Sequence, residues 1–101
     1  MVITILEARV PEDSWEALRA AYNHKALELP EQVRQSFLVQ NAEDPTLWHI
    51  VSIWSSREAL NDYQRSTAIP GGVRIFREAG VEPTLSVLKV HGHLVGARTV
   101  L

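Results

Sequence analysis

The sequence has no cysteine, no long apolar run and no concentration of positive charge. Without cysteine, the chain cannot form disulfide bonds, thiolate nucleophiles or cysteine-ligated zinc and iron–sulfur centres. No apolar stretch approaches the roughly 20 residues that cross a bilayer as a helix. The first residues also lack the charged-then-apolar profile of a signal peptide. We therefore expect a cytoplasmic protein with no membrane partner.

Charge and glycine content exclude two further kinds of site. The 10 lysines and arginines are scattered among 12 aspartates and glutamates, and the net charge is −2. This balance argues against a nucleic-acid partner. The segment Pro70-Gly71-Gly72 lacks the lysine and the preceding strand that a phosphate-binding loop requires.

The length of 101 residues predicts a single domain, 1–101, with a core over residues 2–91 and a weakly patterned C-terminal tail at 92–101. A domain of this size buries only about 60–65% of the surface of its unfolded chain. A partner subunit would therefore add considerably to its stability.

The hydrophobic pattern predicts an α+β fold. Stretches rich in β-branched and aromatic residues predict four strands, at residues 2–10, 33–40, 46–54 and 84–91. Helical spacing predicts helices at 14–29, 56–66 and 73–79. This order is the β-α-β-β-α-β plan of ferredoxin-like folds, in which helices cover one face of a four-stranded antiparallel sheet.

Helix boundaries are predicted from capping residues. Asp13 is expected to cap the first helix, and Pro30 to end it at about residue 29. Ser55 and Glu58 have the spacing of a capping box at the start of the helix that follows the third strand.

The predicted sheet is apolar on both faces. In the third strand, Trp48, Ile50 and Trp54 alternate with the opposite-facing Leu47, Val51 and Ile53. Helices in so short a chain can cover only one of these faces. We therefore predict a homodimer with the two open sheet faces packed together, and we place His49 at that interface as a hydrogen-bonded side chain.

The chain resembles the antibiotic biosynthesis monooxygenase family of dimeric α+β barrels over roughly residues 2–91. The most specific part of the resemblance is IWSSREALNDYQRS, residues 53–66, where a strand with a tryptophan runs into a serine-capped helix. Some members of this family oxidise phenolic polyketides to quinones without a metal or flavin. Others act on quinols, degrade haem, or have no established chemistry.

Only some of the residues that are typical of the family's functional positions are present in this chain. Trp54 matches the family tryptophan, whereas Ser52 stands where many members have a glutamate. Tyr63 stands where many have a histidine and where the haem-degrading branch has a tryptophan. Val73 stands where that branch has its haem-ligating histidine. Haem degradation is therefore disfavoured, and we expect no cofactor.

Five residues are candidates for a substrate pocket. Trp54 would form the wall of an aromatic site, or alternatively pack only in the core. Tyr63 would donate a hydrogen bond or act as an acid, or alternatively reach solvent from a half-buried helix face. Arg9, His91 and His24 rank lower as polar groups, and Arg9 near the end of its strand is also read as solvated. No catalytic residue can be named.

A metal site is not predicted. His91 and His93 are two residues apart and would project from the same face of a strand. Two histidines and a carboxylate can hold iron, but the sequence places no third ligand near them.

The resemblance implies a cofactor-independent monooxygenase that acts on a small aromatic or phenolic compound. In such an enzyme the protein helps to deprotonate a phenol, and the anion passes an electron to oxygen. The alternative is a non-catalytic dimeric domain that binds a small hydrophobic ligand. A third possibility is another enzyme on the same fold.

Overall fold

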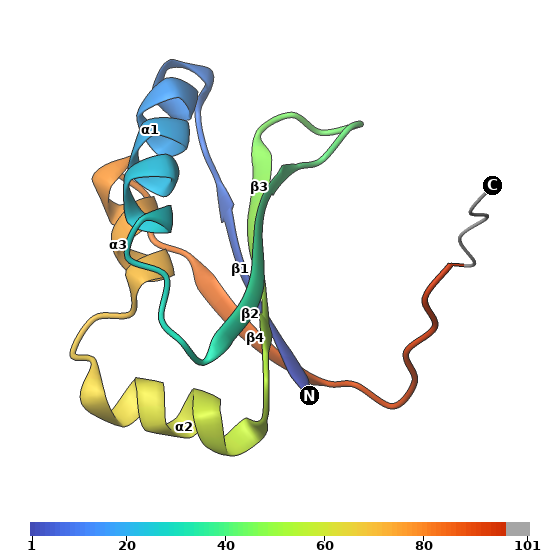
Figure 1. Ribbon diagram of the computed structural model, residues 1–101. Coiled ribbons are helices and arrows are strands. Elements are labelled where there is room, and N and C mark those ends of the chain that lie inside the picture. The colour runs from blue at the N-terminus through green and yellow to red at the C-terminus, as the bar shows by residue number, and fades with distance from the viewer. Residues whose placement is uncertain (97–101) are drawn as a thin grey trace, which may run out of the picture.

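The computed structural model describes residues 1–96 and contains four strands, three α-helices and one 3₁₀ turn (Figure 1). The strands are β1 (Val2–Arg9), β2 (Val33–Gln40), β3 (Leu47–Trp54) and β4 (Thr84–Lys89). The helices are α1 (Trp15–Ala26), α2 (Arg57–Ser66) and α3 (Gly71–Glu78), and the turn η1 spans Glu12–Ser14. None of these helices has the length and apolar character needed to cross a membrane.

The strands form one sheet in the order β2-β3-β1-β4, and every neighbouring pair is antiparallel. All three helices lie on one side of this sheet (Figure 1). The predicted ferredoxin-like α+β fold is therefore confirmed.

The main core lies between the sheet and the helices α1 and α3. Leu18 of α1 and Phe76 of α3 are completely buried there, against Leu6 and Ile50 of the sheet. A second, smaller cluster lies under α2 and contains Val2, Val33, Trp54 and Leu60. The core thus has two parts, and the functional site described below lies beside the second.

The first helix is shorter at both ends than predicted. It begins at Trp15, because Asp13 lies inside the η1 turn and makes no capping hydrogen bond. It ends at Ala26, and the backbone then turns through bonds from Leu27 N to His24 O and from Glu28 N to Lys25 O. The predicted end at residue 29 was wrong, and Leu29 is 47% exposed.

The capping box predicted at Ser55 does not form. The backbone N–H of Ser55 instead donates to the carbonyl of Gln32, which extends the pairing beyond β3. Ser56 takes the capping position, and its Oγ accepts from the backbone N–H of Ala59 at 3.0 Å. The third helical residue is therefore Ala59 rather than Glu58. A glutamate at that position would accept a hydrogen bond from the backbone N–H of the capping serine, and alanine cannot.

Two other boundaries differ from the predictions by two residues each. Helix α3 begins at Gly71, two residues earlier than expected, and Gly80 follows it in the left-handed conformation with φ of 83°. Strand β4 stops at Lys89, so His91 lies outside the sheet. Residues 91–96 lead away from the domain on the side opposite the helices (Figure 1).

No helix of the described residues covers the second face of the sheet. Ile3, Ile5, Val51 and Ile53 are half-buried there, and a further group is exposed: Phe37, Val39 and Leu88. His49 lies on this face, as predicted, and its Nε2 is 2.9 Å from Glu7 Oε1. We refer to this surface as the open sheet face.

The capping assignment can be tested with two adjacent serines. We expect Ser56→Ala to lower the free energy of unfolding by about 1 kcal/mol, because the N–H of Ala59 loses its acceptor. Ser55→Ala is the matched control and should change it by less than about 0.5 kcal/mol. Urea unfolding of both variants measures the difference, and a larger loss for Ser55→Ala would contradict the assignment.

Candidate functional site

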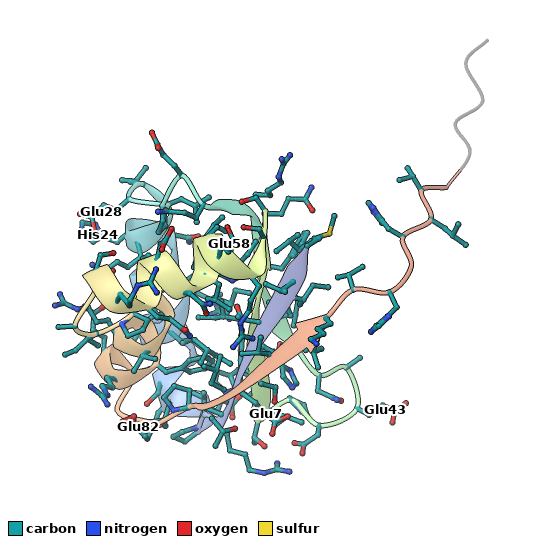
Figure 2. All side chains as sticks on the ribbon, turned by 90° about the horizontal axis from the view of Figure 1, so that it is seen from below. Glu7, His24, Glu28, Glu43, Glu58 and Glu82 are labelled. Atoms are coloured by element: carbon teal, nitrogen blue, oxygen red, sulfur yellow. The ribbon has the colours of Figure 1, made fainter. Side chains whose placement is uncertain are left out.

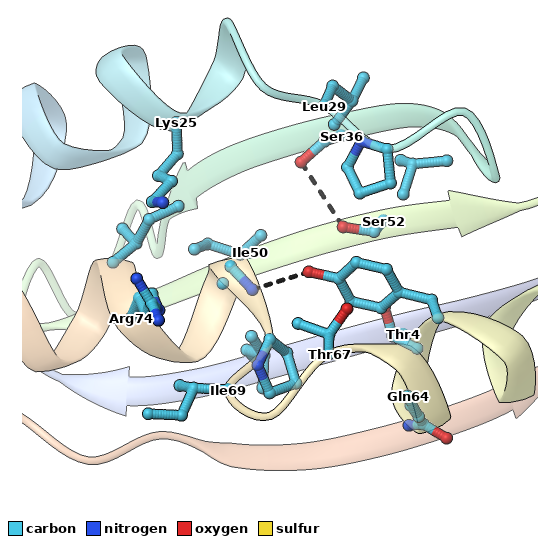
Figure 3. Close-up of a pocket in the computed structure, with 18 of the residues that line it drawn as sticks. Thr4, Lys25, Leu29, Ser36, Ile50, Ser52, Gln64, Thr67, Ile69 and Arg74 are labelled. Carbon is cyan, nitrogen blue, oxygen red and sulfur yellow. Dashed lines mark hydrogen bonds between the residues drawn. The ribbon is translucent and has the colours of Figure 1, made fainter.

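A cavity of about 440 Å³ lies between the sheet and all three helices (Figure 3). Its wall comes from β1, β2, β3 and β4, from α1, α2 and α3, and from the segments that follow α1 and α2. Most of the wall is apolar, and the larger aliphatic side chains in it are Leu6, Leu29, Ile50, Leu60, Ile69, Ile75 and Leu85. Besides Gln64 and Thr67, two groups of polar side chains occur in this wall.

The first polar feature is a row of three hydroxyl groups on the helix-covered face of the sheet. Thr4 of β1 pairs with Ser52 of β3, and Ser52 pairs with Ser36 of β2, so the three side chains lie at one level across the strands. Ser52 Oγ lies 3.5 Å from Ser36 Oγ, a long hydrogen bond (Figure 3). The Tyr22 hydroxyl donates to Ser36 Oγ at 3.0 Å. We call Thr4, Ser52 and Ser36 the hydroxyl row.

Trp54 closes one end of the hydroxyl row. Its side chain is buried, and its Nε1–H donates to Thr4 Oγ1 at 2.9 Å. Its ring contacts the ring of Tyr63, with centroids 5.2 Å apart and planes tilted by 47°. Because its N–H is already bonded, Trp54 offers the cavity an aromatic surface and no hydrogen-bond donor.

Tyr63 connects α2 to the start of α3. Its hydroxyl oxygen accepts from the backbone N–H of Gly71 at 2.9 Å. Within residues 1–96 no acceptor is bonded to its own proton, so this O–H can donate to a molecule in the cavity. At Gly72, which follows Gly71, a Cβ would lie 2.5 Å from Leu6 Cδ1, so a larger residue there would require the Leu6 side chain to shift.

The second polar feature is a group of charged side chains. Lys25 of α1 and Arg74 of α3 both line the cavity, as does Glu28. Lys25 Nζ is 3.2 Å from Glu28 Oε2, whereas Arg74 makes no ion pair with any described residue. Glu28 is the one carboxylate among the described wall residues.

Of the five predicted pocket residues, the structure brings Trp54 and Tyr63 together in the cavity wall. Arg9, His24 and His91 lie outside it. His24 is exposed on α1, at the outer edge of the domain with Glu28 (Figure 2), and His91 is exposed beyond the end of β4.

Arg9 lies on the open sheet face because strand alternation places it with Ile3 and Ile5. Its Nη1 donates to Asp44 Oδ2 at 2.6 Å and to Thr46 Oγ1 at 3.0 Å. The bond from Arg9 lowers the pKa of the Asp44 carboxyl below its usual range. Arg9 therefore fixes the loop between β2 and β3, at an exposed position.

The described residues contain no group of three or more histidine, aspartate or glutamate side chains able to hold a metal ion. His91 and His93 are both exposed. Within residues 1–96 the cavity wall also has no histidine or methionine, and these are common axial ligands of haem. Val73 of α3 packs against the main core instead.

Sequence reasoning missed Thr4, Ser36, Lys25 and Arg74. The hydroxyl row follows from strand register, which joins residues far apart in the chain. One local signal was available for Lys25: it lies three residues after Tyr22 and so shares its side of α1. Both residues line the cavity.

The sequence model of one protein family, described as antibiotic biosynthesis monooxygenase, matches residues 1–74 of the chain. A search of curated proteins gives no match. Among solved structures, a Deinococcus radiodurans protein described as a candidate antibiotic biosynthesis monooxygenase has a TM-score of 0.71 at 15% identity, over 98% of this chain and 100% of its own.

Two further structures are similar. Rv0793 from Mycobacterium tuberculosis has a TM-score of 0.68 at 19% identity, over 93% of this chain and 98% of its own. A mutant of MhuD with two manganese protoporphyrin IX molecules bound per active site has a TM-score of 0.72 at 19% identity, over 95% of this chain and 100% of its own. At such identities the likeness concerns the fold.

The bond between Trp54 and Thr4 can be tested by Thr4→Val, which keeps the side-chain shape. We expect the free energy of unfolding to fall by about 1–3 kcal/mol, because the buried indole N–H loses its acceptor. Thr84→Val, at an exposed position of β4, is the matched control. Equal unfolding midpoints for the two variants in urea would contradict the role of this bond.

Proposed function

This chain belongs to the antibiotic biosynthesis monooxygenase family, and on that premise we propose that it binds a small, flat, phenolic molecule in its cavity and oxidises it with O₂. The observation that carries the proposal is the cavity itself. It has about 440 Å³ of space, apolar walls and a row of hydroxyl groups on its floor. Sites for small organic molecules have this size and this mixture of surfaces.

The proposed ligand lies with its rings against Trp54 and Tyr63 and with an oxygen at the hydroxyl row. The Ser36 and Tyr63 hydroxyl oxygens accept hydrogen bonds, and among the described residues neither donates its own proton, so both can donate to the ligand. Hydrogen bonds donated to a phenolate favour the charged form and so lower the pKa of the bound phenol. The surrounding apolar wall keeps water from competing for these bonds.

The wall holds no histidine among the described residues, and its one carboxylate, Glu28, is paired with Lys25. We therefore propose a substrate that loses its proton readily, such as an anthrone. Its deprotonated carbon gives one electron to O₂, and the radical and superoxide then combine to form a C–O bond. Protonation and loss of water leave the ketone of a quinone, with one oxygen atom in the product and one in water.

A second candidate function is ligand binding without catalysis. Ser52 and Tyr63 stand where many family members have a glutamate and a histidine, so the groups that usually carry proton transfer are absent at these positions. A cavity that binds phenols and leaves them unchanged would suit this set of side chains.

We also propose that the protein is a homodimer with the open sheet faces packed together. Ile3, Ile5, Val51 and Ile53 form a half-buried apolar surface, flanked by the exposed Phe37, Val39 and Leu88. Contiguous apolar surface of this kind is typical of a protein–protein contact. The His49–Glu7 pair places one polar group within it.

Oxygen consumption in the presence of an anthrone and of a quinol tests the enzymatic proposal. We expect O₂ uptake with formation of the quinone, and we expect Ser36→Ala to lower kcat/KM by about tenfold or more because a donor to the developing anion is lost. Ser55→Ala, at an exposed position outside the cavity wall, should leave the rate unchanged. Binding of either compound without O₂ uptake would favour the non-catalytic candidate.

Sedimentation at micromolar concentration tests the dimer. We expect Val51→Lys to produce a monomer, because an unpaired charge would be buried in the contact. Ala20→Lys adds the same charge at an exposed position of α1 and should remain a dimer. A monomeric unsubstituted protein would overturn the proposal.

A further inference from the structure

Two of the polar parts of the cavity wall differ in their chemistry. Neutral hydroxyls of the sheet lie in one part, whereas Lys25 and Arg74 both lie toward the opposite side of the view in Figure 3. Ile50 lies between these two groups in the same view. A molecule that fills the cavity would therefore meet hydroxyl groups with one part and cations with another.

The cationic part carries a net positive charge. Lys25 is opposed by Glu28, to which it is bonded at 3.2 Å, but Arg74 has no ion-pair partner among residues 1–96. The three side chains together leave one positive charge at this part of the wall. Lys25 is also partly shielded from solvent, with 24% of its side chain exposed, and such shielding strengthens its attraction for an anion. Arg74 is exposed at this side of the wall, where an incoming carboxylate can reach it.

We propose that the cavity selects a flat aromatic molecule that carries a carboxylate, with Arg74 as the main residue that recognises the acid. A guanidinium group presents two parallel N–H donors that match the two oxygens of a carboxylate. Lys25 contributes charge from the neighbouring helix α1. This inference rests on the proposed binding of an aromatic ligand in the cavity and adds the substrate class to it.

The two polar parts then fix the orientation of the ligand. The carboxylate lies between α1 and α3, and the rings extend toward Trp54 and Tyr63. The reactive oxygen or carbon is thereby placed near the hydroxyl row. Arg74 acts as a binding and positioning residue, because it holds a group that takes no part in the oxidation.

Calorimetric titration with two probes of the same shape tests the proposal. The probes are 2-naphthoate, which is ionised at neutral pH, and 2-naphthamide, which is uncharged. We expect 2-naphthoate to bind about tenfold more tightly at low salt, as a charge-assisted hydrogen bond requires. Arg74→Gln should remove most of this preference and leave the affinity for 2-naphthamide unchanged.

Two further variants control for charge. Glu28→Gln frees Lys25 and should tighten 2-naphthoate binding by about two- to threefold, since the competing carboxylate is gone. Arg57→Gln makes the same charge change as Arg74→Gln, at an exposed residue outside the cavity wall, and should have no effect. Circular dichroism of each variant establishes that the fold is retained.

The possible outcomes distinguish the proposed aromatic site from its proposed specificity for a carboxylate. Equal affinity for the two probes, or a preference that survives in Arg74→Gln, would overturn the acid specificity and leave the aromatic site standing. Failure of both probes to bind would overturn the aromatic site and the acid specificity with it.

Discussion

The hydrogen bond from Trp54 to Thr4 connects most of the features of this molecule. It joins the end of β3 to β1 and leaves the indole ring against Tyr63 of α2. Tyr63 in turn accepts from Gly71, the first residue of α3. One continuous set of contacts therefore runs from the sheet through α2 to α3, and the cavity lies beside it.

This arrangement explains why a small domain keeps an internal space. The main core under α1 and α3 is filled by side chains such as Leu18 and Phe76. The second cluster, around Trp54 and Leu60, supports α2 at a separate place on the sheet. The cavity lies where these two parts meet, and small hydroxyl-bearing side chains occupy part of its floor, beside Leu6 and Ile50.

The fold could be predicted from local patterns, and the site only in part. Strand β2 has its predicted bounds, because alternation and its flanking residues are local signals. The cap at Ser56 was placed one residue early because Ser55 has the same chemistry and only the pairing with Gln32 distinguishes them. The hydroxyl row and the presence of Lys25 and Arg74 in one cavity wall depend on strand register and helix packing. Neither can be obtained from spacing along the chain.

The central claim is that a flat aromatic molecule binds beside Trp54. The three tryptophans of the chain make it testable, because Trp15 and Trp48 contact each other in the main core and do not line the cavity. Titration with 2-naphthol, followed through the three indole N–H signals in an NMR spectrum, is the most direct measurement. We expect a saturable shift of the Trp54 signal, whereas the signals of Trp15 and Trp48 stay in place. An unmoved Trp54 signal, or equal shifts of all three, would contradict this claim.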